Sequence, residues 1–392
     1  MRCLYFCRAY HNSQHGGRTH AREFFAALSK DPRVEATRVL PSAPVANGSE
    51  QHAKKAAPKP FQRYRDLLRV FIPRDTTTNM LINELRDGGF DTLIVRYTGM
   101  ERLLYQKIRQ ALPHVSIALE INSTYIAEEY PANIFYRALD WLECQHFREA
   151  HVIFVVSEHL RAHLIDRGLD PARVIVNPNG VDPAVFSPSI QIDAAAMREQ
   201  FKIPSDALIL GYVGGMETFR RLPLLVEQFA ELRRRGHKKL FLLIIGAGKD
   251  WQAVIDAIAK HHDVLDGWVS TLGWQPHNEV PKLMRLFDIA IFPYTNDYVS
   301  PLKLFEYLAM GMATVGPDIS GIRGIFLDRE HLRLVSQTEL NFVAVMEELL
   351  AQPEQMRQLA QQGLQHVVTH YTWQHNVAKV LDGIQAPGAS ER

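Results

Sequence analysis

The stretch 298–311 combines a cation with residues that start and end a helix, at a spacing that suits anion binding. Ser300 is a good N-cap residue, Pro301 suits the first helical position, and Gly311 is typical of a helix end. The free amides and the positive dipole at a helix start attract an anion, to which Lys303 adds charge. A lysine is unfavourable at this end of a helix, and a bound anion would explain its presence.

A carboxylate follows on the same face of this predicted helix. Glu306 lies three residues after Lys303, so the two side chains are neighbours. A carboxylate there can accept hydrogen bonds from the two hydroxyls of a ribose. The alternative is an ion pair between the two residues on the surface of an amphipathic helix. The spacing alone favours neither interpretation.

Other kinds of site lack their sequence signatures. The chain contains no P-loop, no Gly-x-Ser-x-Gly and no His-Glu-x-x-His. Residues 246–248 follow a strand-like run but lack the third glycine of a dinucleotide fingerprint. No two aspartates are separated by one residue, so the Asp-x-Asp metal site is not available. We therefore expect neither a metal nor a bound cofactor.

Composition narrows the class of protein. The 392 residues suffice for two or three domains. Lys and Arg number 44 against 43 Asp and Glu, so net charge does not imply nucleic acid. The cysteines Cys3, Cys7 and Cys144 form neither a disulfide framework nor a zinc spacing. No apolar run approaches ~18 residues, so we expect a cytoplasmic protein that is at most peripheral at the inner face of the membrane.

Short apolar runs alternate with helical patterns, which predicts parallel sheets covered by helices. The strand-like runs of the first half are 33–40, 91–97, 115–121, 152–156 and 173–176. Those of the second half are 207–213, 240–245, 268–272, 288–292 and 313–316. Pro and polar residues interrupt the rhythm between Pro183 and Pro204, and the tail from about 338 to 386 is helical. The class is α/β, with two doubly wound domains.

One segment departs from this pattern. Residues 41–60 are typical of a loop, and 61–74 mix basic and apolar residues at helical spacing. Seven basic residues fall within 54–74: Lys54, Lys55, Lys59, Arg63, Arg65, Arg69 and Arg74. A helix that covers the sheet with a solvated basic face is one interpretation. A surface that contacts anionic lipid or an anionic acceptor is the other.

The stretch 298–311 resembles the donor-site signature of retaining glycosyltransferases of the two-domain GT-B fold, specifically glycosyltransferase family 4. The segments that resemble this family follow its order along the chain: Gly16-Gly17, 156–160, 168–174, 177–182, 186–188, 211–215, Arg220, 224–229, 242–248, 272–274 and 371–373. Each segment alone is moderately specific for this family, whereas the order and spacing of all the segments together are strongly specific for it.

This resemblance implies two Rossmann-like domains that face each other across a cleft. Residues 1–185 would form the acceptor-side domain and 200–370 the domain that binds a nucleotide sugar. Residues 371–392 would form a helix that returns to the first domain. The implied reaction moves a sugar from a nucleotide-diphospho sugar to a hydroxyl of a glycan, lipid-linked or small-molecule acceptor, with retention and without metal.

The resemblance also implies roles for residues in the second domain. Arg220 and Lys303 would hold the pyrophosphate, and Glu306 would hold the ribose. Gly214 and Gly215 would let the backbone approach the phosphates. The remaining expected donor contacts are Gly16, Gly17, Trp274, Tyr298, Ser300 and Leu302. Trp274 would lie beside the base or, alternatively, serve as a core or rim residue.

Three positions depart from the family pattern. Gly215 stands where the family often has a basic residue, and Tyr298 stands where it has its first glutamate, with Asp297 adjacent but out of register. Asn122 stands where many members have a histidine. Glu120 and Asn122 share one face of a strand, so either can approach the acceptor, and a buried, hydrogen-bonded Glu120 is the alternative.

Two rival functions follow from these departures. One is a GT-B enzyme that epimerises or hydrolyses a sugar nucleotide. The other is a non-catalytic GT-B scaffold, which Gly215, Tyr298 and Asn122 favour. The intact Arg220, Lys303 and Glu306 oppose it. The base, the sugar and the acceptor stay open.

Overall fold

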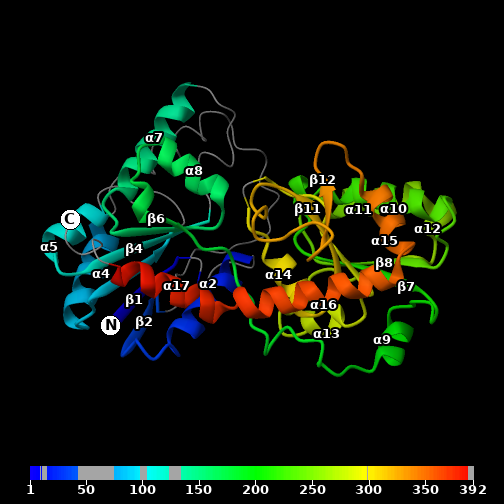
Figure 1. The fold of residues 1–392 in the computed structure, drawn as a ribbon, viewed down its shortest axis with the longest axis horizontal. Coiled ribbons are helices and arrows are strands. Elements are labelled where there is room, and N and C mark those ends of the chain that lie inside the picture. The colour runs from blue at the N-terminus through cyan, green and yellow to red at the C-terminus, as the bar shows by residue number, and fades with distance from the viewer. Residues whose placement is uncertain are drawn as a thin grey trace. The chain divides into compact units, whose positions relative to one another are not determined.

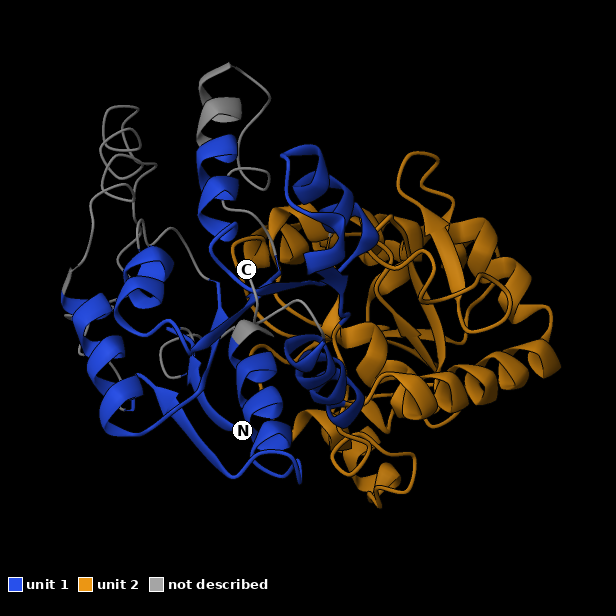
Figure 2. Cartoon of the chain, turned by 60° about the vertical axis from the view of Figure 1, so that its left-hand side comes forward, with its two compact units in different colours: residues 1–178, 373–392 blue, residues 179–372 orange. Residues whose placement is uncertain are grey.

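The computed structural model describes residues 1–8, 10, 16–42, 75–97, 104–122, 134–297 and 299–386. The chain divides into two compact units, one formed by 1–178 with 373–392 and the other by 179–372 (Figure 2). Each unit contains one six-stranded sheet in which all neighbouring strands are parallel. The predicted fold class, two doubly wound α/β units, is confirmed. The basic segment 54–74 lies outside the described residues, as does Tyr298.

The first unit has the strand order β2-β1-β3-β4-β5-β6 (Figure 1). Its strands are β1 (Arg2–Phe6), β2 (Ala36–Leu40), β3 (Thr92–Arg96), β4 (Ser116–Ile121), β5 (Val152–Val155) and β6 (Val174–Val176). Its helices are α2 (Gly16–Leu28), α4 (Asp75–Asp87), α5 (Leu104–Ala111), α7 (Ile134–Phe147), α8 (Glu158–Asp166) and α17 (Trp373–Gln385), with the 3-10 turn η1 (Pro171–Arg173). The strand β1, which was not predicted, lies second in the sheet.

Helices cover both faces of the first sheet. Apolar side chains of α4, α5, α7 and α8 pack with one face into a single core cluster. On the other face, Phe24 of α2 packs on Tyr5 with ring centroids 5.2 Å apart, and α17 packs on α2, β4 and β5. A Cβ at Gly383 of α17 would lie 2.8 Å from the ring of Phe154, so glycine permits this close approach. The last helix thus completes the first unit.

The second unit has the strand order β12-β11-β10-β7-β8-β9. Its strands are β7 (Leu208–Val213), β8 (Leu240–Ile245), β9 (Val269–Thr271), β10 (Ile289–Ile291), β11 (Ala313–Asp318) and β12 (Arg333–Ser336). Its helices are α9 (Ala194–Gln200), α10 (Leu222–Arg234), α11 (Trp251–Lys260), α12 (His262–Leu265), α13 (Val280–Met284), α14 (Leu302–Ala309), α15 (Phe342–Leu350) and α16 (Pro353–His370), with the 3-10 turn η2 (Thr218–Arg220). The strand β12 was not predicted, and α9 lies where only an irregular segment was expected.

Two stacked imidazoles hold α16 against the segment that precedes β12. The rings of His331 and His366 lie 3.8 Å apart at 15°. The N–H of Leu327 donates to His331 Nδ1 at 3.1 Å, and His366 Nε2 donates to the carbonyl of Ile325 at 2.7 Å. Burial lowers the pKa of both histidines, and the neighbouring His366 lowers that of His331 further, outweighing the nearby Glu330. The packing therefore favours neutral rings.

We expect this contact to make the second unit acid-sensitive. The pKa of each ring is lower when folded than in the unfolded chain, where it is about 6.5. The unfolded chain therefore binds more protons as the pH falls below about 6.5, and the free energy of unfolding decreases there. Urea unfolding at pH 7 and pH 5 should show this loss, and the variant His331→Asn, which keeps an acceptor for Leu327, should lose less. Equal losses in the two proteins would contradict this role of the stacked pair.

Candidate functional site

Three loops meet at the carboxyl edge of the second sheet, where ligands of such folds bind. Gly214 and Gly215 follow β7 directly, and the N–H of Gly214 donates to the carbonyl of Ile245 at 3.0 Å. The N–H of Gly246 donates to the carbonyl of Gly273 at 2.8 Å, which joins the loops after β8 and β9. A Cβ at Gly246, whose φ is +141°, would lie 1.9 Å from the carbonyl oxygen of Gly214. Glycine is therefore required where these loops touch.

The helix α14 starts at the same edge, after the loop that follows β10. It begins at Leu302, which is half-buried, and Pro301 occupies the N-cap position without a capping side chain. The prediction that Ser300 caps the helix is wrong. The Ser300 carbonyl accepts from Asn179 Nδ2 at 2.5 Å instead, which ties the helix start to the beginning of the second unit. Gly311, with φ of +68°, ends the helix as predicted.

Lys303 and Glu306 form an ion pair on α14, with 2.5 Å between Nζ and Oε2. Glu306 is only 1% exposed, whereas the Lys303 side chain is 22% exposed. The ion pair of the alternative interpretation is therefore present, but its placement on the helix surface is wrong, because the carboxylate is buried. Glu306 Oε1 is also buried and has no hydrogen-bond partner among the described residues. A buried carboxylate oxygen without a donor is costly, so this atom can accept a hydrogen bond from a ligand hydroxyl.

Arg220 is the last residue of η2 and reaches the loop that leads to α14. Its Nη1 donates to Thr295 Oγ1. Its guanidinium lies 4.4 Å from the ring centre of Phe292 and 4.8 Å from that of Phe219. Burial lowers the pKa of Arg220, but an arginine stays a cation in proteins. The structure thus places a partly desolvated cation beside the segment that carries Lys303.

Two further predicted positions lie around this edge. Trp274 follows Gly273 and is 62% exposed, so it is a rim residue and the interpretation as a core residue is wrong. Asp297, the neighbour of the undescribed Tyr298, accepts from the N–H of Ser320 at 2.9 Å and from its Oγ at 2.5 Å. Because both carboxylate oxygens hold Ser320, Asp297 serves as a tie between two loops.

The first unit contains the remaining predicted residues. Gly16 and Gly17 form the first turn of α2, and Asn122, which directly follows β4, is half-buried. Glu120 is buried and hydrogen-bonded, as the alternative interpretation holds. Its Oε2 accepts from the Tyr5 hydroxyl at 3.0 Å, and its Oε1 lies 3.4 Å from His20 Nε2.

The charge of Glu120 is stabilised by these neighbours. Burial acts to raise its pKa, but His20, Arg96 and Tyr5 together outweigh burial, and the pKa lies below its usual range. His20 and Tyr5 were not predicted to take part. The one signal in the sequence is that His20 follows the glycine pair by three residues, on the same helix.

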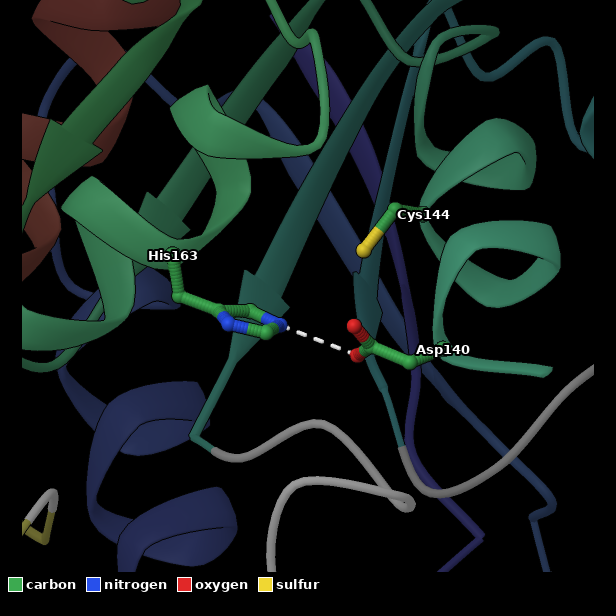
Figure 3. Close-up of side chains that lie close together, drawn as sticks. All are labelled: Asp140, Cys144 and His163. Carbon is green, nitrogen blue, oxygen red and sulfur yellow. Dashed lines mark hydrogen bonds and ion pairs between the residues drawn. The ribbon is translucent and has the colours of Figure 1, made fainter. Parts of the chain in front are cut away.

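One group of possible metal ligands occurs among the described residues, outside this site. Asp140 and Cys144 of α7 and His163 of α8 point toward one another (Figure 3). Asp140 Oδ1 lies 2.9 Å from His163 Nε2, and Oδ2 accepts from Arg167 Nε at 2.5 Å. A cation already neutralises the carboxylate, and burial raises the pKa of the Cys144 thiol. The group is therefore an ion-pair network between α7 and α8, and we propose no metal there.

Two family models match the chain. The model described as Glycosyltransferase Family 4 matches residues 15–185, and the model described as Glycosyl transferases group 1 matches residues 207–352. This chain is a glycosyltransferase of the family 4 type. The resemblance to that family and the implied activity, transfer of a sugar, are confirmed.

Known proteins resemble this glycosyltransferase over part or nearly all of its length. The D-inositol 3-phosphate glycosyltransferase of Stackebrandtia nassauensis is 26% identical over 323 residues, 78% of this chain and 71% of that protein. The enzyme of the same name from Kineococcus radiotolerans is 44% identical over 181 residues, 43% of this chain and 40% of that protein. Among solved structures, Anabaena HepE in complex with UDP has a TM-score of 0.72 at 11% identity, covering 98% of this chain and 99% of that one. That likeness confirms the GT-B fold.

We expect Arg220 and Lys303 to contribute separately to transfer by this glycosyltransferase. Replacing either with Ala removes a charge-assisted contact of ~1.5–3 kcal/mol, which corresponds to a loss in kcat/KM of roughly 10- to 150-fold. The matched control is Lys282→Ala, which removes another lysine–glutamate pair three residues apart, that of Lys282 in α13 with the preceding Glu279, both with exposed side chains. Steady-state kinetics, with the melting temperature of each variant, test this. Wild-type kcat/KM in Lys303→Ala would remove Lys303 from the site.

Proposed function

We propose that this glycosyltransferase binds a nucleotide-diphospho sugar at the carboxyl edge of its second sheet and transfers the sugar to an acceptor hydroxyl with retention and without metal. The observation that carries the proposal is the buried Oε1 of Glu306, which has no hydrogen-bond partner in the part of the chain that the structure describes, beside the ion-paired Oε2. Two vicinal ribose hydroxyls are donors of the kind that this carboxylate lacks. HepE, a protein of the same fold, has a solved structure in complex with UDP, which supports a donor of this kind.

The diphosphate leaving group becomes more negative as the glycosidic bond breaks. Arg220 and Lys303 supply two positive charges, and the amides at the start of α14 supply hydrogen-bond donors. Fixed donors and cations of this kind stabilise charge that develops in the transition state, without a metal. Gly214 and Gly215, which lack side chains, let the backbone approach the phosphates.

The acceptor step needs a base and a means of orienting the hydroxyl. We assign the base to a phosphate oxygen of the donor, on the face where the acceptor attacks, and assign no protein nucleophile. On the acceptor side, Asn122 is half-buried and follows β4, so its amide can contact a hydroxyl. Glu120, held by Tyr5 and His20, has both oxygens engaged and acts by fixing the end of β4.

The place of the enzyme in the cell is a separate prediction. Among the described helices, none is both long and apolar enough to cross a bilayer. The cytoplasmic location and peripheral contact through 54–74 stay predictions from the basic residues of that segment. Loss of salt-sensitive vesicle binding after neutralising four of those charges tests the contact.

We expect the product to keep the anomeric configuration of the donor and the reaction to continue in EDTA. Activity in EDTA is expected because the cationic side chains, rather than a bound ion, balance the charge of the diphosphate. NMR of the product distinguishes transfer with retention from inversion, and free epimerised or hydrolysed sugar would favour the rival enzyme class. Complete loss of transfer in EDTA, restored by Mg²⁺ or Mn²⁺, would contradict the metal-free mechanism.

We expect Glu306→Gln to weaken binding of a ribonucleoside diphosphate and to matter less for its 2′-deoxy analogue. The amide keeps the shape but loses the charge and one acceptor, and a charge-assisted bond contributes ~1.5–3 kcal/mol. The deoxy ligand already lacks one partner, so the two changes are coupled. Calorimetric titration of both ligands measures the coupling, with Glu279→Gln as the control, since Glu279 is paired with Lys282 but has an exposed side chain. Equal penalties for both ligands would show that Glu306 does not contact the ribose.

A further inference from the structure

A buried tyrosine hydroxyl joins α14 to the end of β7. Tyr307, which is 0% exposed, lies one residue after Glu306 on α14. Its hydroxyl accepts from the N–H of Val213 at 2.6 Å and donates to the carbonyl of the same residue at 3.3 Å. Burial raises the pKa of Tyr307 well above its ordinary value, so the hydroxyl is neutral and can serve both bonds.

The end of β7 needs a partner because the strand on one side stops early. The strand β7 pairs with β8 along its whole length, up to Val213, but with β10 only at Leu210 and Gly211. The N–H of Gly214 points to β8, since it donates to Ile245. Successive residues of a strand point their backbone groups to opposite edges, so those of Val213 face the side where pairing with β10 has ended. The Tyr307 hydroxyl replaces the missing strand.

A second tyrosine hydroxyl acts on the same turn from within β7. Tyr212 donates to the carbonyl of Gly215 at 3.0 Å. Its ring stacks on that of Phe292, with centroids 5.7 Å apart at 4°. Phe292 is also the ring on which the Arg220 guanidinium lies. The two hydroxyls therefore bond to the residues on either side of Gly214. Tyr307 belongs to α14, which carries Lys303, and Tyr212 stacks on the ring that the Arg220 guanidinium faces.

We infer that the hydroxyls of Tyr307 and Tyr212 position the Gly214–Gly215 turn against α14, and so set the spacing between the backbone and the side chains that hold the donor diphosphate. The inference rests on the proposed function of this edge. Neither hydroxyl contacts the donor, because both are engaged with backbone of the protein. They are positioning residues, and small displacements of a phosphate-binding group lower affinity strongly.

The test compares Tyr307→Phe with Tyr294→Phe. Tyr294 is a matched control in the same unit, since it is 1% exposed and its hydroxyl donates to Gln228 Oε1 at 2.6 Å, away from the turn. Calorimetric titrations use UDP, GDP, ADP and dTDP, and for the diphosphate that binds best also its free nucleoside. In Tyr307→Phe we expect about tenfold weaker binding of the diphosphate and unchanged binding of the nucleoside, because the phosphate contacts are displaced. Donor KM should rise to a similar extent.

Tyr212→Phe is the second variant, needed if Tyr307→Phe does not fold. It leaves the exposed Gly215 carbonyl to water, and we expect a smaller loss, again confined to the diphosphate. Two results would overturn this inference and leave the proposed function intact. One is unchanged diphosphate binding in folded Tyr307→Phe, and the other is an equal loss of affinity for nucleoside and diphosphate. A wild-type protein that binds none of the four diphosphates overturns the proposed function as well.

Discussion

The buried carboxylate of Glu306 is the constraint on which the second unit depends. A buried charge requires a partner, and Lys303, one turn earlier on α14, supplies it at 2.5 Å. The helix that carries the pair is held at two points: Asn179 bonds the backbone at Ser300, and Tyr307 bonds the end of β7. Within the described residues, the second carboxylate oxygen has no hydrogen-bond donor. An unused acceptor therefore lies on the helix that starts at the edge where parallel sheets bind their ligands.

Parallel strands explain why residues far apart in sequence meet at this edge. The loops after β7, β8, β9 and β10 all leave the same side of the sheet. The first three of these loops are joined to one another by backbone hydrogen bonds, at Gly214, Gly246 and Gly273, and the fourth contains Thr295. These hydrogen bonds of the three glycines join backbone to backbone, whereas Thr295 contacts Arg220 through its side chain. A Cβ at Gly246 would overlap the carbonyl oxygen of Gly214, so glycine is needed at Gly246 for packing itself.

The sequence predicted the fold well because alternation of apolar runs with helical patterns reflects burial in parallel sheets. It missed β12 because Arg333 interrupts the apolar run, and this arginine is buried by ion pairs with Asp328 and Glu348. It missed α9 because prolines flank a short alanine-rich helix. In the site, spacing along one helix was enough to pair Lys303 with Glu306. Spacing could not show that Asn179, which lies 121 residues from Ser300, bonds to the Ser300 side chain. Ser300 therefore does not cap α14, contrary to what the local sequence had suggested.

Glu120 of the first unit and Glu306 of the second are both buried, but their carboxylate oxygens are satisfied to different extents. Glu120 is the residue before the last of β4 and has Tyr5 and His20 on its two oxygens, with the charge of Arg96 nearby. Its hydrogen-bonding capacity is used within the protein, so it holds β4, α2 and β1 together. Glu306 is as deeply buried but has a single partner, Lys303, among the described residues. Because buried polar atoms are nearly always satisfied in folded proteins, an acceptor left open at a ligand-binding edge supports the proposed contact between Glu306 and the ribose. Glu120, whose two oxygens are both engaged, belongs to the framework of the first unit.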